Sequence, residues 1–173
     1  MAQTLSAILP QRPFADDPVV LTDVPDDARA AFRVLFEEHL TDELEPALRD
    51  LGLTHAELLE LPERVGELSA ARLGTEVVGF VWIEVRELVL HVHGLVLRPE
   101  FRGRGLGARL LRALEEEFRG IVDELELGVH DANEGARALY LRCGFRDVER
   151  RPEIGFSIMR KRVEPDDMKE KER

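Results

Sequence analysis

Residues 95–107 have the sequence LVLRPEFRGRGLG, and this stretch decides the fold more than any other part of the chain. An apolar run is followed by a turn at Pro99, then by three alternating glycines and the start of an amphipathic pattern. Glycine tolerates a positive φ and lets another group approach the backbone. A helix that begins there presents free N–H groups and a partial positive charge, which attract phosphate. The stretch therefore predicts a strand, a phosphate-binding loop and a helix.

Three interpretations of this loop compete: a helix-start turn that binds nothing, a nucleotide site, and a cradle for another pyrophosphate. Arg102 and Arg104 add mobile positive charge, which favours an anionic ligand. Residues 103–108 fit the dinucleotide pattern G-x-G-x-x-G/A. That pattern belongs to a doubly wound parallel sheet, and the short hairpin turns that precede this loop do not fit such a sheet. A nucleoside-triphosphate loop needs G-K-[ST], which is absent. The nucleotide interpretations are therefore disfavoured.

Strand-like and helix-like patterns lie on both sides of the loop. Residues 74–76 and 86–87 form turns so short that they join antiparallel neighbours. The helix expected after the loop makes the strand at 125–129 parallel to the strand before the loop. Thr54 and Glu57 match a helix capping box. Strands are expected at 19–22, 65–73, 77–86, 88–97, 125–129, 145–149 and 154–160, and helices at 26–40, 54–61, 105–119 and 133–142.

Length and composition set outer bounds on the function. The 173 residues suit one domain, which we expect at 19–162, between a mobile lead-in (1–18) and a charged, disordered tail (163–173). The net charge of −11 disfavours nucleic acid as a partner and is compatible with a cationic substrate. The sequence shows no apolar run of spanning length and no signal peptide, so we expect a cytoplasmic protein with no membrane partner.

Two motifs resemble those of a known family. PEFRGRGLG at 99–107 is similar to the acetyl-CoA signature Q/R-x-x-G-x-G/A of the GCN5-related N-acetyltransferase (GNAT) superfamily. NEGARALYLRCGF at 133–145 resembles that family's N-x-x-A-x-x-L-Y-x-x-x-G-F segment, in the usual order and separation. The resemblance covers residues 19–162. It implies an α+β fold in which a mixed, mainly antiparallel sheet, with a splayed central parallel strand pair, is flanked by helices.

The resemblance also implies acetyl-CoA as co-substrate and assigns residues to it. The pantetheine arm would pair with the backbone of the strand before the loop. Asn133 resembles the residue that contacts this arm, although a plain N-cap explains it equally well. The residues so implied are Leu95, Val96 and Leu97 for pantetheine, and Arg102, Gly103, Arg104, Gly105, Leu106, Gly107 and Ala108 for the pyrophosphate.

Acetyl transfer to an amine needs a proton acceptor, because an alkylamine is largely protonated at pH 7. The family's glutamate on the central strand falls here on His91, and His93 lies on the same face of the strand. Glu84, acting through water, is the third candidate base. Tyr140 matches the position that protonates the departing CoA thiolate. Each of these residues could instead serve in packing or at the surface.

Three further assignments concern a metal, the oxyanion and the single cysteine. The His91–His93 pair has no evident third ligand, so no metal is expected. A backbone N–H near Leu97 would stabilise the oxyanion, as the resemblance implies. Cys143, the single cysteine, excludes an intramolecular disulfide and is expected to pack.

The sequence predicts acetyl-CoA-dependent N-acetylation of a primary amine, and the acceptor stays open. A polyamine-like molecule, an amino-sugar antibiotic and a protein N-terminus all fit, and a homodimer is compatible with the pattern. The alternative is a non-catalytic acyl-CoA-binding regulatory module. Tyr140 argues against that alternative, whereas the absent glutamate argues for it.

Overall fold

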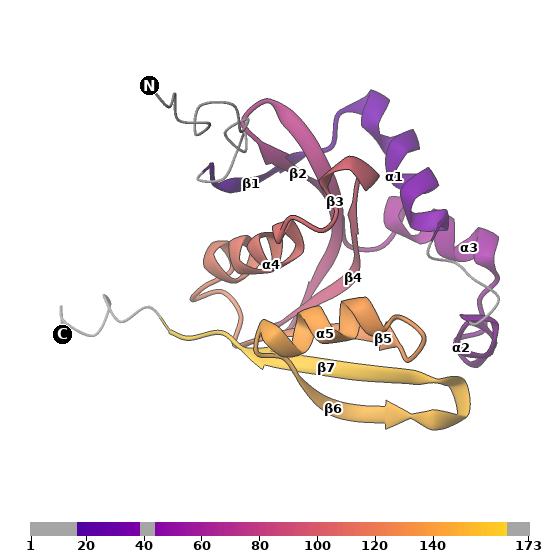
Figure 1. Ribbon diagram of the computed structural model, residues 1–173. Helices are drawn as coiled ribbons and strands as arrows, with labels where there is room; N and C mark the ends of the chain where they lie inside the picture. Colours follow the sequence, from indigo (N-terminus) through magenta and orange to yellow (C-terminus); the bar gives the residue numbers. More distant parts are fainter. Residues whose placement is uncertain (1–16, 39–43, 166–173) are drawn as a thin grey trace, which may run out of the picture.

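The protein is built around one twisted seven-stranded sheet (Figure 1). The computed structural model describes residues 17–38 and 44–165. All neighbouring strands are antiparallel except β4 and β5, which are parallel. The strand order is β1 (Val19–Asp23), β2 (Glu67–Leu73), β3 (Glu76–Arg86), β4 (Val89–Leu97), β5 (Glu124–His130), β7 (Phe156–Arg162) and β6 (Arg146–Arg151).

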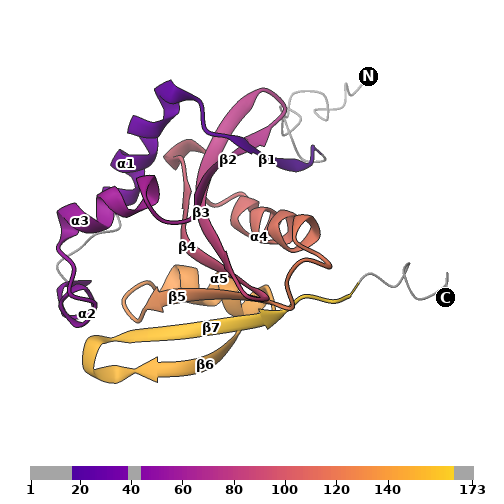
Figure 2. The same ribbon diagram turned by 180° about the vertical axis from the view of Figure 1, so that it is seen from behind.

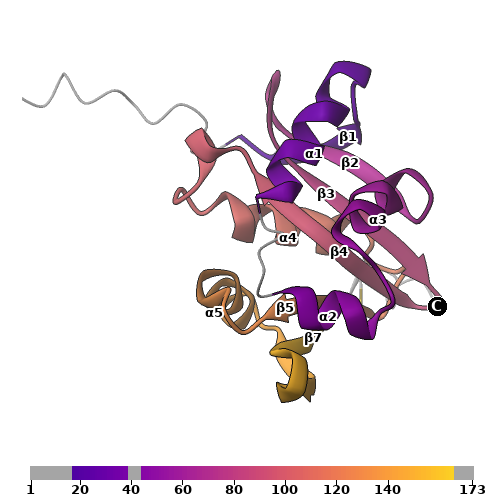
Figure 3. The ribbon, with the colours of Figure 1, turned by 90° about the vertical axis from the view of Figure 1, so that its right-hand side faces the viewer.

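Helices cover both faces of the sheet (Figures 1 and 3). On one face, apolar side chains of α4 join a core cluster with those of β3, β4 and β5, and α5 packs against the same cluster. On the other face, α1 and α3 pack against Phe80, Trp82 and Val96. The helices are α1 (Arg29–Glu37), α2 (Glu45–Asp50), α3 (His55–Glu60), α4 (Leu106–Glu117) and α5 (Glu134–Arg142).

A β-bulge lies in the middle of β4. Trp82 pairs with Gly94 and Ile83 pairs with Val92, so His93 is an extra residue in β4. Because a bulge bends the strand and places two consecutive side chains on one face, the alternation along β4 changes there. His93 packs against Trp82, and a Cβ on Gly94 would lie 3.0 Å from the ring of Phe36 in α1.

β4 and β5 part beyond this bulge. Their parallel ladder joins Val89–Val92 to Glu124–Leu127 and ends there. Residues 93–97 of β4 continue paired to β3 alone, and residues 128–130 of β5 continue paired to β7 alone. The splayed parallel pair implied by the family resemblance is therefore present, and the sheet forks at its centre.

The expected elements are confirmed with small shifts at their ends, except that residues 39–40 of the helix expected at 26–40 lie outside the described residues. The Thr54–Glu57 capping box forms as predicted. Two features were not predicted. Helix α2 was not assigned, and β7 inserts between β5 and β6, which reverses the spatial order of the last two strands (Figure 2). None of the helices among the described residues is long and apolar enough to cross a membrane.

The expected domain boundaries can be compared with the structure only where residues are described. Val163, placed in the tail by the sequence, is buried, and its N–H donates to the carbonyl of Asp123 at 2.8 Å. The packed chain therefore runs past residue 162. Most of the expected lead-in (1–16) and most of the tail (166–173) lie outside the described residues.

Candidate active site

The three glycines of the loop have two different structural roles. Gly103 and Gly105 have φ values of +70° and +76°, and a Cβ at either would meet no atom within 4 Å. They shape a left-handed turn whose surface is free for a ligand. Gly107 is buried instead, and a Cβ there would lie 2.9 Å from Cδ2 of Leu139 in α5. The third glycine therefore lets α4 and α5 pack closely.

The first turn of α4 offers backbone donors to a ligand. It has no side-chain cap, so the N–H groups of Leu106, Gly107 and Ala108 are available for an anion. The two arginines before it lie along the loop. Arg102 donates to the carbonyl of Leu97 and to Glu38, both at 2.9 Å, and the guanidinium of Arg104 lies 5.8 Å from the centroid of Phe101.

The backbone of β4 beyond the bulge presents alternate residues to the fork. The N–H of Arg98 donates to the carbonyl of Val78 in β3 at 2.9 Å. Because backbone groups of successive strand residues point to opposite sides, Val96 also faces β3, whereas Leu95 and Leu97 face the fork. Of the three residues implied for pantetheine, two therefore offer their backbone and Val96 does not.

His93 is held by a carboxylate of the neighbouring strand. Its Nε2 lies 2.9 Å from Glu84, and Glu84 also accepts from Arg86 at 2.6 Å. The hydrogen bond from Arg86, helped by His93, lowers the pKa of Glu84 to about 2. Burial lowers the pKa of His93 from its usual value despite the nearby carboxylate. An ionised carboxylate only accepts hydrogen bonds, so Nε2 carries the proton and Nδ1 is the basic nitrogen.

A second histidine–carboxylate pair lies beside the first. His91 Nδ1 lies 2.9 Å from Glu126 of β5, which also accepts from Arg160 of β7 at 2.6 Å. The rings of His91 and His93 are nearly parallel, at 14°, with centroids 6.1 Å apart. The two imidazoles therefore share one face of the sheet, as predicted from their spacing.

Glu126 and Arg160 were missed by sequence reasoning. The alternation around Glu126 shows which residues of β5 share a face, but it does not show which of them lie beside the histidines. That depends on the register of β4 and β5, which no local pattern sets.

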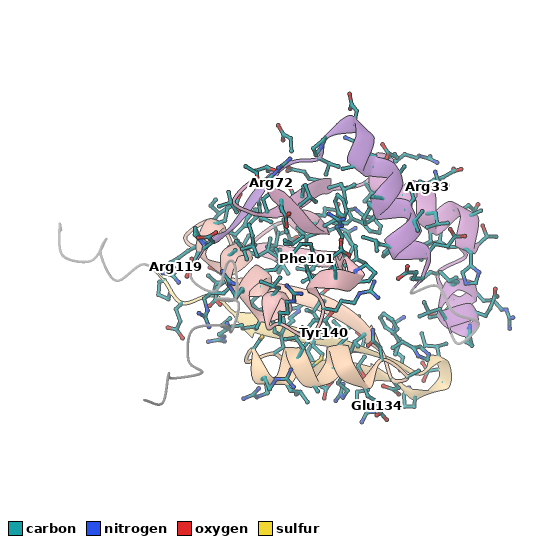
Figure 4. The ribbon with its side chains drawn as sticks, turned by 45° about the horizontal axis from the view of Figure 1, so that its top comes forward. Arg33, Arg72, Phe101, Arg119, Glu134 and Tyr140 are labelled. Atoms are coloured by element: carbon teal, nitrogen blue, oxygen red, sulfur yellow. The ribbon has the colours of Figure 1, made fainter. Side chains whose placement is uncertain are left out.

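Tyr140 lies on the inner side of α5, whereas Glu134, on the first turn of the same helix, points outward (Figure 4). Burial raises the pKa of Tyr140 to about 12, so its phenol carries a proton at neutral pH. Its ring packs 5.9 Å from Phe145, and half-buried Cys143 joins the same core cluster. The structure thus combines the predicted packing role of this face with a protonated phenol.

Asn133 begins α5 as an N-cap. Its Oδ1 accepts from the N–H of Ala136 at 3.1 Å. A contact with a ligand would therefore fall to its Nδ2 group. Over residues 17–38 and 44–165, no three His, Cys, Asp or Glu side chains gather as a metal site requires.

Comparisons with known proteins find related N-acetyltransferases. Over 82 residues the chain is 39% identical to the N-alpha-acetyltransferase RimI of Mycobacterium tuberculosis, a match that covers 45% of this chain and 51% of that protein. The matched segment thus spans about half of that relative. Over 136 residues it is 32% identical to glucosamine 6-phosphate N-acetyltransferase 1 of Oryza sativa subsp. japonica, covering 79% of this chain and 73% of that protein.

The fold is also shared with a solved structure that was determined in complex with coenzyme A. The PaiA N-acetyltransferase of Thermoplasma acidophilum, in complex with coenzyme A, matches with a TM-score of 0.58 and 16% identity, over 83% of this chain and 98% of that chain. The model of the acetyltransferase (GNAT) family matches residues 24–145, which include the glycine loop and Tyr140. The chain therefore belongs to the acetyltransferase (GNAT) family.

Proposed function

We propose that this protein transfers the acetyl group of acetyl-CoA directly to a primary amine. One observation carries the proposal: β4 and β5 part next to the uncapped first turn of α4. The fork offers backbone groups to the two amides of a pantetheine arm, and the helix start offers N–H donors to a pyrophosphate. These two features lie at adjacent positions, as one extended ligand requires.

The same geometry supports the cofactor contacts. Pantetheine would pair with the backbone of Leu95, and the pyrophosphate would lie over residues 102–108. The carbonyl of Leu97 is already bonded to Arg102, so its N–H is the group left for the thioester oxygen. Such a donor, fixed in place before the reaction, stabilises the oxyanion of the tetrahedral intermediate.

His93 is the base that fits the site best. Its lowered pKa keeps the imidazole neutral at pH 7, and the hydrogen bond to Glu84 holds Nδ1 as the proton acceptor. Glu84, with a pKa of about 2, is too weak a base and acts as the group that orients His93. After the amine attacks and the C–S bond breaks, Tyr140 supplies a proton to the thiolate.

The acceptor is a primary amine of a small molecule or a protein. By their names, one relative acetylates an α-amino group and the other an amino sugar phosphate, and the group that these two acceptors share is the primary amine. The side chains of His93 and Glu84 are partly exposed, which supports access of an amine to the base.

The test measures acetyl-CoA binding by calorimetry and thiol release over a panel of amines: a polyamine, an amino sugar and a peptide with a free N-terminus. We expect one class to release thiol. His93→Gln should lower kcat about 100-fold or more, and Tyr140→Phe should lower kcat while the Kd for acetyl-CoA stays constant. Binding without thiol release from any amine would make the protein a non-catalytic acyl-CoA-binding module, and absence of binding would overturn the proposal.

A further inference from the structure

We infer that the site contains a second proton acceptor, His91, which Glu126 and Arg160 hold in position to take the second proton that the acceptor nitrogen loses. The inference rests on the proposed acetyl transfer and extends it. It makes Glu126 and Arg160, neither of which lies in the two sequence motifs, positioning residues for the reaction.

The first support is the contacts of the Glu126 carboxylate. Its Oε1 lies 2.9 Å from Nδ1 of His91, and its Oε2 accepts from Arg160 at 2.6 Å. The side chains of His91 and Glu126 are only 18% and 17% exposed, so water competes weakly for these bonds. A carboxylate beside Nδ1 favours the tautomer of His91 that carries the proton on Nδ1 and the lone pair on Nε2.

The second support is the symmetry of the two histidine pairs. Glu84 reaches His93 from β3, and Glu126 reaches His91 from β5, so the two rings lie side by side between carboxylates on opposite strands. Each imidazole keeps one basic nitrogen.

Charged groups from three strands surround His91. On its face of the sheet lie Glu84 and Arg86 from β3, His93 from β4, Glu124 and Glu126 from β5, and Arg160 and Arg162 from β7. Each of these carboxylates is paired with a guanidinium group, so the surroundings of the ring carry no excess of negative charge.

The acceptor nitrogen loses two protons in the reaction, and the two imidazoles can take one each. R–NH₃⁺ first gives one proton to His93 and becomes the nucleophile R–NH₂. Its lone pair forms the C–N bond, and the nitrogen of the tetrahedral adduct, again positive, gives a second proton to His91. The C–S bond then breaks, and the thiolate takes a proton from Tyr140. Overall, R–NH₃⁺ and acetyl-CoA yield the amide, CoA–SH and one H⁺, and the second proton returns to Tyr140 through solvent.

The test compares Glu126→Gln with Glu124→Gln. Both changes remove one negative charge from β5 beside Arg160, but only Glu126 contacts His91. The amide that replaces the Glu126 carboxylate can donate to Nδ1 of His91 and so place the proton on Nε2, which then cannot accept one. We expect kcat to fall at least tenfold in Glu126→Gln with the Kd for acetyl-CoA unchanged, and to stay within twofold of the wild type in Glu124→Gln.

The pH profile separates a positioning role from a structural one. In the wild type both histidines must be neutral, so the acid limb of kcat/KM should show the loss of two protons. In His91→Ala and in Glu126→Gln the acid limb should show the loss of one proton. The double variant should be no slower than His91→Ala alone. If Glu126→Gln does not fold, His91→Gln tests the same limb.

Equal activity in Glu126→Gln and Glu124→Gln, or an acid limb that keeps its slope in His91→Ala, would overturn the inference. His93→Gln would still be inactive in that case, so the proposed acetyl transfer would stand. Failure of the proposed function itself looks different, because the wild type would then release no thiol with any amine.

Discussion

The two halves of β4 have opposite properties although they belong to one strand. Residues 89–92 are paired on both sides, to β3 and to β5, and the buried Leu90 fills the core beneath them. Residues 93–97 are paired to β3 alone and leave backbone groups free at the fork. His91 belongs to the paired half and His93 to the bulge that ends it. A single extra residue thus places a strand paired on both sides next to a strand with one open edge.

The largest effect should come from weakening the paired half. Leu125→Ala removes a side chain that is 0% exposed beneath the β4–β5 ladder, and we expect it to lower the free energy of unfolding by about 3 kcal/mol. Leu97→Ala, in the open half, removes a partly exposed side chain and should cost about 1 kcal/mol. Urea denaturation measures both. Equal losses would show that the two halves do not differ in stability as their pairing indicates.

A smaller effect should follow from straining the loop beside the open half. Gly105→Ala forces a side chain to φ +76° and should cost about 1–2 kcal/mol while weakening acetyl-CoA binding several-fold. Gly135→Ala is the matched control, because Gly135 lies within α5 without a positive φ and with no atom within 4 Å of its Cβ position. The control should gain about 0.5–1 kcal/mol and bind acetyl-CoA normally. A similar affinity for both variants would contradict a cradle at Gly105.

The smallest effect concerns the carboxylate at the junction of the halves. The pKa of Glu84 is lowered from 4.5 to about 2 in the folded protein, so its ionised form stabilises the fold above pH 4.5. This contribution is lost as the pH falls from 4.5 towards 2, where the folded protein also takes up the proton. Glu84→Gln should therefore be less stable than the wild type at pH 6, and the difference should shrink below about pH 4. Parallel stability curves at both pH values would disprove the linkage.

Local chemistry explains what the sequence could predict of the fold. Thr54 with Glu57, and the turns at residues 74–76 and 86–87, act over a few residues, so the pattern and the structure agree there. The insertion of β7 between β5 and β6 depends on pairing between distant segments. Residues 145–160 indicate two strands equally well in either spatial order.

The candidate site, like the fold, could be predicted from the sequence only where its residues are close together along the chain. The glycine loop and Tyr140 belong to contiguous motifs, whereas Glu126 and Arg160 meet His91 only through the registers of β4, β5 and β7. The bulge at His93 also has no local signal, because an extra residue is defined only against the partner strand. Sequence reasoning therefore found the groups that lie together along the chain and missed those that the sheet brings together.

The position of β7 has a consequence for the timing of assembly during synthesis. Among the strands of the described residues, β7, which carries Arg160, is the last to leave the ribosome, yet it occupies an inner place between β5 and β6. A nascent chain that ends before residue 156 exposes one side of β5 and leaves Glu126 without its guanidinium partner. The paired histidines therefore reach their final arrangement only after translation has passed the last strand, and a truncated product lacks the complete set.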